Sequence, residues 1–211
     1  MKENDEDEKE RLRKLNEDRR QRRLDKWPEK LEGIINIFPS LLQKDLKTLK
    51  EKNVIQKKSL TDKGLFIFGK VGSGKTIFSL FLLIKYIREK HIENNDLNEF
   101  LFITSNEFFL LLRKAQAKKI EMDEFDVLDK YCNVDVLVLD DFGIEKTSDW
   151  TFQMLYQLIN YRHLHEKKTI ITSNFSLEQL TEKLGDDRIP SRIQSMCEIV
   201  EKTGIDFRSK V

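Results

Sequence analysis

Apolar residues along this chain fall into short continuous runs, separated by segments in which apolar positions recur every three or four residues. Continuous runs predict buried strands of a parallel sheet, and the wider spacing predicts helices with one covered face. From about residue 60 the two patterns alternate, which predicts an α/β domain with a central parallel sheet flanked by helices. The predicted strands are 64–68, 100–104, 135–139, 169–172 and a last one at Ile199 and Val200, and the predicted helices are 75–90, 105–119, 148–165 and 177–184.

The beginning of the chain has a different pattern. Residues 1–26 are nearly all charged or polar, with an acidic block followed by the basic block Arg11–Arg23. Such a segment cannot bury a core by itself, so we expect a solvated helix or a disordered segment. Apolar residues then return with helical spacing until Pro39, which must break or kink the helix. We therefore predict a charged helical arm over 1–58, suited to binding a partner, and an ATPase domain over 59–211.

Composition narrows the functional classes. The 211 residues carry a formal net charge of +1, which gives no whole-protein argument for nucleic-acid binding. Two cysteines, Cys132 and Cys197, are too few for a disulfide framework or a four-ligand zinc site, and their apolar neighbours indicate buried thiols. No apolar run reaches the length of a membrane span, and the acidic first residues are the opposite of a signal peptide. We expect a cytoplasmic protein.

The stretch GKVGSGKT, residues 69–76, matches the phosphate-binding pattern G-x-x-x-x-G-K-[ST] and lies between a predicted strand and a predicted helix. Its glycines allow backbone angles at which successive N–H groups cradle phosphate oxygens at the start of a helix. Lys75 places a charge between the β- and γ-phosphates, and the Thr76 hydroxyl can ligate Mg²⁺. The residues predicted to contact ATP in this stretch are Gly69, Val71, Gly72, Ser73, Gly74, Lys75, Thr76 and Ile77.

Two carboxylates follow the strongest apolar run. Asp140 comes directly after Val136–Leu139, where it would hold Mg²⁺ together with Thr76. Asp141 points to the other side and could orient or deprotonate the attacking water. A solvated turn is the alternative interpretation of this dipeptide. Aspartate in place of the commoner glutamate at the second position makes the hydrolytic role of Asp141 less secure.

Polar residues also end the next apolar strand. In Thr-Ser-Asn the amide of Asn174 can bind the attacking water or the γ-phosphate, although such a tripeptide is usually a helix cap. Arg188 and Arg192 follow, and an arginine placed there can reach the γ-phosphate of a neighbouring subunit. A surface arginine paired with Asp186 or Asp187 is the alternative.

Five stretches together resemble the DnaC/DnaI/IstB branch of AAA+ ATPases, over about residues 60–211. They are GKVGSGKT (69–76), LVLDDFGIEKTSDW (137–150), NYRHLHEKKTIITSNFSLEQL (160–180), LGDDRIPSRI (184–193) and GIDFRSKV (204–211). The combination D-D-x-G-x-E-K-x-S-x-W, T-S-N and R-I-x-S-R is far more specific than a P-loop alone. Within the branch the likeness is closest to the bacterial replicative helicase loaders.

This resemblance implies a P-loop NTPase core of the AAA+ type without a separate helical lid, for which the chain is too short. Asn174 is then similar to sensor I, and Arg192, rather than Arg188, matches the arginine finger that acts across a subunit interface. Arg208 is similar to a sensor II arginine that touches the nucleotide of its own subunit. The family also implies that the helix over 105–119 lines single-stranded DNA. Its basic residues are Arg113, Lys114, Lys118 and Lys119, and the adjacent Phe108 and Phe109 would either face that DNA or belong to the core.

The implied function is that of an ATP-dependent loader of a hexameric replicative helicase. The ATP-bound homo-oligomer would bind single-stranded DNA, the N-terminal arm would hold the helicase, and hydrolysis would trigger release. The cofactors are ATP and Mg²⁺, and weak intrinsic hydrolysis is expected because no single subunit has a complete site. An IstB-type helper, which acts on duplex DNA with a transposase, shares these motifs. A nucleotide-gated scaffold with little hydrolysis is a third interpretation, and a metabolic kinase would have no reason to carry the later motifs.

Overall fold

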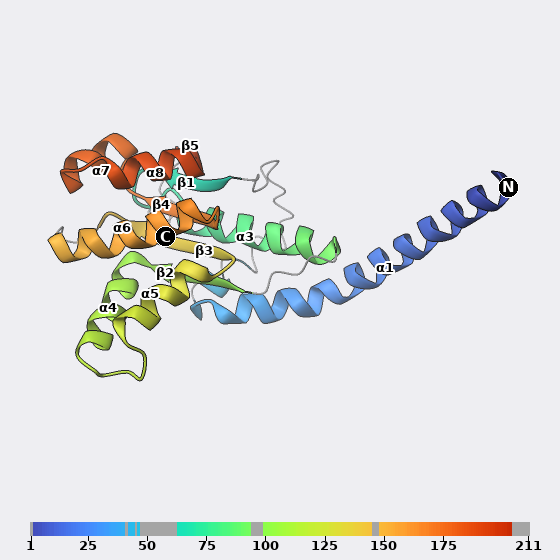
Figure 1. Ribbon diagram of the computed structural model, residues 1–211, viewed down its shortest axis with the longest axis horizontal. Coiled ribbons are helices and arrows are strands. Elements are labelled where there is room, and N and C mark those ends of the chain that lie inside the picture. Colours follow the sequence, from blue (N-terminus) through green and yellow to red (C-terminus); the bar gives the residue numbers. More distant parts are fainter. Residues whose placement is uncertain are drawn as a thin grey trace. The chain divides into compact units, whose positions relative to one another are not determined.

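The computed structural model describes residues 2–40, 42–44, 46, 63–93, 99–144 and 148–203, and the chain divides into two compact units (Figure 1). One unit contains helix α1 (Lys2–Ile37) and the second half of helix α3 (Lys75–Ile92). The other contains the first half of α3 and a β-sheet with the helices that follow it. Arg208 and the predicted end of the arm near residue 58 lie outside the described residues.

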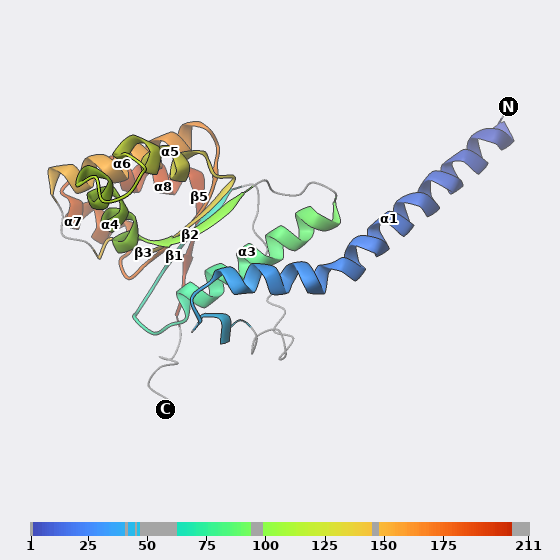
Figure 2. The same ribbon diagram turned by 90° about the horizontal axis from the view of Figure 1, so that it is seen from below.

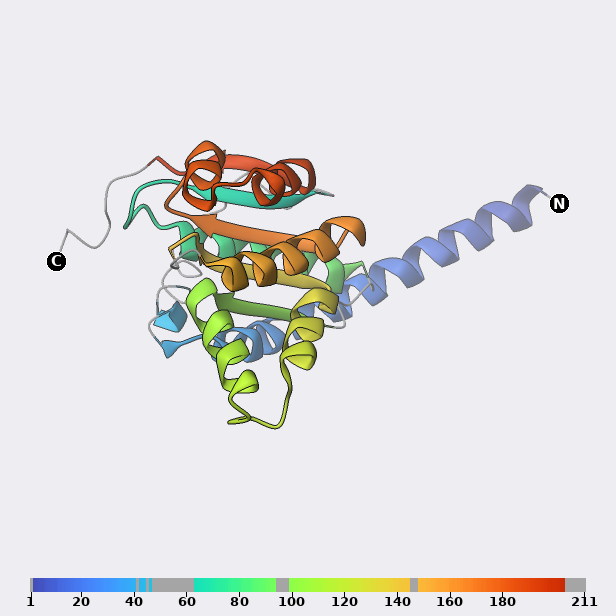
Figure 3. The same cartoon turned by 60° about the vertical axis from the view of Figure 1, so that its left-hand side comes forward.

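The sheet has five parallel strands in the order β2-β3-β4-β1-β5, seen side by side in Figure 3. Strand β4 therefore lies between β3 and β1, although it follows both in sequence. The three central strands are apolar at consecutive positions because residues on both of their faces are buried. The strands are β1 (Gly64–Phe68), β2 (Phe100–Thr104), β3 (Val136–Phe142), β4 (Lys168–Ser173) and β5 (Cys197–Glu201).

Helices cover the sheet as the alternating pattern predicts. Figure 2 shows α4 to α8 on one face, whereas α3 begins on the opposite face. The larger set comprises α4 (Ser105–Gln116), α5 (Glu124–Asn133), α6 (Asp149–Leu164), α7 (Leu177–Leu184) and α8 (Arg188–Met196). Their apolar residues form one core with the sheet, in which Phe108 is 0% and Phe109 3% exposed. The prediction of an α/β fold with a central parallel sheet is confirmed.

Local sequence signals set where several of these helices begin. Four of them start with a capping box, in which the residue before the helix and the third helical residue bond each other's backbone N–H groups. Each such cap stabilises its helix by about 1 kcal/mol. The pairs are Thr104 with Glu107, Asp123 with Asp126, Ser148 with Thr151, and Ser176 with Gln179.

Some sequence predictions of the fold are wrong in detail. Helices α5 and α8 were not expected, and the helix predicted over 105–119 ends at Gln116. Strand β3 continues to Phe142 rather than ending at residue 139, because a bulge lets the two aspartates stay in the strand. The two cysteines are buried free thiols as expected, and burial raises the pKa of Cys132 to about 11 and that of Cys197 to about 12.

Arg162 on α6 is a cation inside the core, with 0% of its surface exposed. Its Nε donates to Thr169 Oγ1 at 2.8 Å, and its two terminal nitrogens donate to four backbone carbonyls at 2.7–3.0 Å. Those carbonyls belong to Tyr131, Cys132, Val134 and Lys168. Burial lowers the pKa of Arg162 to about 10, so it remains charged at neutral pH. One side chain thus joins the end of α5 to the start of β4.

In the other unit, α1 is a continuous helix that ends two residues before Pro39, as the proline requires. Its second half has a buried face, which comprises Trp27, Leu31, Ile34 and Ile35 and continues into Phe38 just after the helix. This half lies beside the end of α3, where Arg23 Nη1 donates to the Ile92 carbonyl at 3.0 Å and Lys30 Nζ lies 3.1 Å from His91 Nδ1. The basic block is therefore helical, and residues 8–22 are exposed. Among the described residues, no helix has the length and apolarity needed to cross a membrane.

Candidate functional site

The glycine-rich loop joins β1 to α3 and has the backbone conformation that its sequence predicts. Gly72 and Gly74 have φ angles of 78° and 81°, in the region that residues with a Cβ rarely adopt. The Gly69 N–H donates to the Ser173 carbonyl at 3.2 Å, which fixes the loop to the end of β4. Ser73 is 1% exposed, and its Oγ has no hydrogen-bond partner within the described part of the chain. The loop therefore offers a buried donor in addition to its N–H groups.

Lys75 is the first residue of α3 and turns back over the loop. Its Nζ donates to the carbonyls of Gly69 and Lys70, both at 2.9 Å, and to Asn174 Oδ1 at 2.8 Å. The side chain is almost fully buried. The positive charge is thus held at the mouth of the loop by neutral acceptors, and Asn174 is brought directly to it.

The next residue, Thr76, lies against the first aspartate of β3. Thr76 Oγ1 is 3.0 Å from both carboxylate oxygens of Asp140. The pKa of Asp140 is raised to about 6, mainly by burial and also by the charge of Asp141, while hydrogen bonds from Thr172 and Thr76 and the charge of Lys75 act in the opposite direction. A hydroxyl and a carboxylate therefore face each other beside the loop.

Asp141 has an unusual backbone conformation, with a φ of 55°. The register of β3 against β4 shifts between Leu139 and Phe142, so Asp141 occupies a bulge. A bulge re-aims one side chain and breaks the strict alternation of the strand. Strain of this kind at a non-glycine residue persists where the surroundings hold it, and such positions cluster at functional sites.

Thr172 holds both aspartates and was missed by the sequence analysis. Its Oγ1 donates to Asp140 Oδ1 at 2.5 Å and accepts from the Asp141 N–H at 3.0 Å. The side chain is fully buried near the end of β4. The signal that could have found it is its place two residues before Asn174, which puts it next to β3 in a parallel sheet.

The predicted arginines lie on α8 and contact α6. Arg192 donates from Nε to Asn160 Oδ1 at 2.7 Å, from Nη2 to Tyr156 Oη at 2.9 Å, and from Nη1 to the Arg188 carbonyl at 2.8 Å. Arg188 instead pairs with Asp186, with Nη2 2.8 Å from Oδ2, and its guanidinium lies over the same tyrosine ring. The alternative of a surface arginine paired with an aspartate thus describes Arg188 and not Arg192.

The structure brings together most of the predicted site. The loop, Thr76, Asp140 and Asn174 meet where β1, β3 and β4 end, whereas Arg192 forms hydrogen bonds with residues of α6 and α8. The basic cluster at the end of α4 is exposed. Phe108 and Phe109 belong to the core, so the suggestion that they face DNA is wrong.

The residues fit a nucleotide with its magnesium ion. The loop supplies N–H groups and a lysine for phosphate oxygens, and Thr76 with Asp140 supplies two oxygen ligands of the kind Mg²⁺ prefers. The described residues contain no group of three or more His, Cys, Asp and Glu side chains that could hold a metal alone. Mg²⁺ commonly binds to one or two protein ligands and completes its shell with water and phosphate oxygens.

The fold and this site define a P-loop ATPase of the AAA+ type. The model of the family described as "IstB-like ATP binding protein" matches residues 4–211, and the chain belongs to that family. It shares the DnaC/IstB type of AAA+ ATPase domain that the sequence resemblance implied.

Solved structures and curated sequences agree with this family. The crystal structure of the DnaC helicase loader is 26% identical with a TM-score of 0.55, and covers 76% of this chain and 88% of its own. The DnaI crystal structure is 28% identical with a TM-score of 0.53, over 78% and 83%. The chromosomal replication initiator protein DnaA of Onion yellows phytoplasma (strain OY-M) is 27% identical over 68% of this chain and 27% of its own length. The chain spans about a quarter of the length of the curated relatives that it matches first.

Proposed function

We propose that this protein is an ATP-dependent loader of a replicative helicase. The observation that carries the proposal is the direct bond from Lys75 to Asn174, which joins the phosphate loop to the residue that we propose as the sensor of a γ-phosphate. The similarity to the DnaC helicase loader over most of both chains supports a loader rather than another P-loop enzyme.

ATP supplies the phosphoryl group that is transferred to water. The loop N–H groups and Lys75 neutralise phosphate charge, and Thr76 with Asp140 would hold Mg²⁺, which adds a positive charge beside the phosphates. Asp141, set apart from the strand by its bulge, orients the attacking water and accepts its proton. Asn174 lies on the loop side of the site, where its amide can bond the phosphate as charge develops on it.

Arg192 would complete the site of a neighbouring subunit. It lies on α8, and none of its hydrogen-bond acceptors among the described residues is a carboxylate. An arginine finger supplied in trans can raise turnover by about 10³-fold or more. Several copies therefore assemble side by side when ATP is bound, and an isolated subunit hydrolyses slowly.

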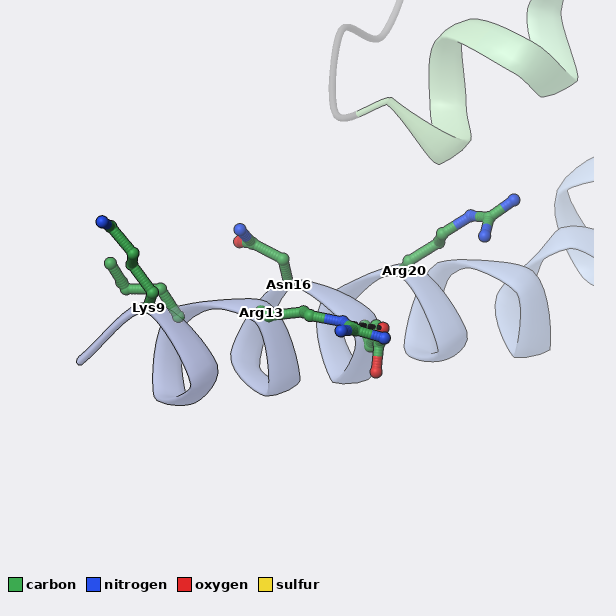
Figure 4. A pocket seen from close by; sticks show the side chains of 6 residues that line it. Lys9, Arg13, Asn16 and Arg20 are labelled. Carbon is green, nitrogen blue, oxygen red and sulfur yellow. Dashed lines mark hydrogen bonds and ion pairs between the residues drawn. The ribbon is translucent and has the colours of Figure 1, made fainter. Parts of the chain in front are cut away.

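The exposed part of α1 is the proposed contact with the helicase. Figure 4 shows Lys9, Arg13, Asn16 and Arg20 along this part of the helix. With the helical spacing of three and four, they continue the face that is buried from Trp27 onward. The helix thus presents a solvated end whose base is fixed by packing against α3.

Single-stranded DNA is the proposed nucleic-acid partner, bound along the basic end of α4. Lys114, Lys118 and Lys119 are exposed there, and the guanidinium of Arg113 lies 5.8 Å from the ring centre of Trp150. Lysines and arginines in such a position can follow a phosphate backbone. Because the two phenylalanines are in the core, this contact would depend on charge and would weaken with added salt.

The experiment is a reconstituted loading assay with the helicase of the same cell and single-stranded DNA. Lys75→Ala should abolish ATP binding and loading, whereas Lys130→Ala, an exposed lysine on α5, should behave as wild type. A variant that lacks residues 2–20 should keep its ATPase activity and lose helicase binding. Normal loading by Lys75→Ala would contradict the proposal.

An IstB-type transposition helper is the second candidate, and the match to the IstB-like family favours it. Its ATPase site would be the same, but the partner would be a transposase and the DNA would be duplex. Purification of the protein from its native cell with ATP present decides between the two partners. Recovery of a transposase without a helicase would replace the loader by the helper.

A further inference from the structure

Two ladders of side chains face each other across α6 and α8. On α6, Phe152, Tyr156 and Asn160 follow one another at intervals of four residues, and the first two rings stack with their centres 6.3 Å apart. On α8, Arg188 and Arg192 are also four residues apart, and both guanidinium groups lie over the ring of Tyr156, at 5.2 and 4.7 Å. One tyrosine therefore serves two arginines.

The two arginines differ in the charge of their partners. Arg188 makes its ion pair with Asp186, which compensates its charge. The acceptors of Arg192 are an amide, a phenol and a backbone carbonyl, all of which are neutral. Arg192 is thus fixed in direction by neutral partners, and the carboxylate of Asp186 acts on its charge without a hydrogen bond between the two side chains.

The number of N–H donors on Arg192 also indicates that it can bind a further acceptor. A guanidinium has five N–H donors in a planar fork. Within the described residues, the three bonds of Arg192 come from its three different nitrogens, so each terminal nitrogen keeps one N–H for a further acceptor. Arg192 therefore keeps donors with which a guanidinium can bind a phosphate.

We propose that Tyr156 and Asn160 are positioning residues that hold Arg192 ready for the phosphate of a neighbouring subunit without forming an ion pair with it. This inference rests on the proposed role of Arg192 in trans. Tyr156 fixes the guanidinium through its ring and its hydroxyl, and Asn160 fixes the Nε side through a neutral oxygen. The neutrality of Asn160 is as important as its hydrogen bond, because a carboxylate at this place would form a bidentate pair with Arg192.

The test compares Asn160→Asp with Asn160→Ala and Tyr156→Phe, with ATP turnover measured at protein concentrations where assembly is complete. Asn160→Asp keeps an acceptor for Nε, so a merely structural contact would leave turnover unchanged. We expect instead a loss of about tenfold or more, with the ATP dissociation constant unchanged, and a smaller loss for Asn160→Ala and Tyr156→Phe. Gln153→Glu, which adds the same charge at an exposed position of α6, is the matched control and should keep wild-type turnover.

Mixed assemblies show in which subunit the defect acts. Asp141→Asn, once shown to be inactive alone, supplies a normal Arg192 to its neighbours. Mixing it with Asn160→Asp should restore turnover, and mixing Asn160→Asp with the double variant Asn160→Asp/Asp141→Asn should not. Wild-type turnover of Asn160→Asp, or a loss that mixing does not restore, would overturn the inference.

Arg192→Ala separates this inference from the proposed function. If Arg192→Ala is fully active in the assembled state, the trans role itself fails. If Arg192→Ala loses activity and is restored by the Asp141→Asn partner while Asn160→Asp is fully active, the trans role stands and only the positioning by Asn160 fails.

Discussion

Lys75 Nζ donates a hydrogen bond of 2.8 Å to Asn174 Oδ1, which joins the start of α3 to the residue just after β4. The contact makes Asn174 a neighbour of the loop's main charge, whereas the cap of the following helix α7 is Ser176. Because the acceptor is a neutral amide, Lys75 can exchange this bond for a phosphate oxygen without breaking an ion pair.

Replacing that amide should separate binding from turnover. Asn174→Ala should leave the ATP dissociation constant within about threefold and lower turnover about 10²-fold, the range for loss of one donor to a developing charge. Asn174→Asp should weaken ATP binding instead, because an ion pair would neutralise Lys75. Titration with a fluorescent ATP analogue and steady-state turnover measure the two effects, and unchanged ATP binding by Asn174→Asp would contradict this account of Lys75.

Thr172→Val should impair the use of Mg²⁺. The valine keeps the branched shape but removes the bond to Asp140 and the acceptor for the Asp141 N–H. Loss of such a supporting bond typically weakens metal affinity about 10- to 100-fold, so the Mg²⁺ concentration for half-maximal turnover should rise by that factor. Thr172→Ser retains the hydroxyl and should restore the wild-type value. A valine variant with normal Mg²⁺ dependence would show that Thr172 only fills space.

Asp140→Asn should stabilise the protein at neutral pH when nucleotide and Mg²⁺ are absent. The folded-state pKa is about 6 against an ordinary 3.8, so the folded state binds its proton more firmly than the unfolded state. The contribution of Asp140 to the free energy of unfolding therefore falls as pH rises from about 4 to about 6 and stays low above that. At pH 7.5 the variant should be more stable by up to about 3 kcal/mol, and near pH 3 the two proteins should be nearly equal.

Urea denaturation in EDTA across this pH range measures the difference. Glu121→Gln removes an exposed carboxylate and should leave the pH dependence unchanged. An Asp140→Asn protein whose stability follows the wild-type curve at every pH would mean that the buried carboxylate carries no such penalty.

Arg162→Lys should destabilise the fold strongly although it preserves the charge. Lysine cannot reproduce five bonds from one planar group, so several buried carbonyls would lose their donor. We expect a loss of about 3–5 kcal/mol in the free energy of unfolding. Arg22→Lys, at an exposed position of α1, is the control and should change stability by less than about 0.5 kcal/mol. A loss below about 1 kcal/mol for Arg162→Lys would contradict the view that the five hydrogen bonds of Arg162 hold α5 and β4 together.

The sequence predicted the strands well because a parallel strand buried on both faces needs a continuous apolar run. It did not predict α5 and α8, although buried residues in each helix lie four positions apart, Val127 and Tyr131 in α5 and Ile189 and Ile193 in α8. In α8, Pro190 reads as a helix breaker, but it lies in the first turn, where its missing N–H costs nothing. The bulge at Asp141 was invisible because it depends on the pairing of β3 with β4.

The residues of the candidate site likewise divide into those that the sequence predicted and those that it did not. The loop, Thr76 and Asp140 are local in sequence or follow an obvious strand, so their pattern was sufficient. Thr172 lies two residues before Asn174, a signal that the sequence analysis did not use. The pair Tyr156 and Asn160 acts only through an arginine that the fold brings to it, and no spacing reveals that contact. Arg162 is the extreme case, since an arginine on a helix normally indicates the solvent side.

The place of β4 at the centre of the sheet has a consequence for how slowly its backbone hydrogen bonds open. This strand has a hydrogen-bonded neighbour on each side and is buried from Thr169 to Ser173, so its amides open only with the whole domain. The residues proposed to sense the nucleotide, Thr172 and Asn174, thus lie in or directly after the strand with the most protected backbone. A signal from these residues would therefore pass through a change of side-chain hydrogen-bond partners, while the backbone of β4 stays fixed.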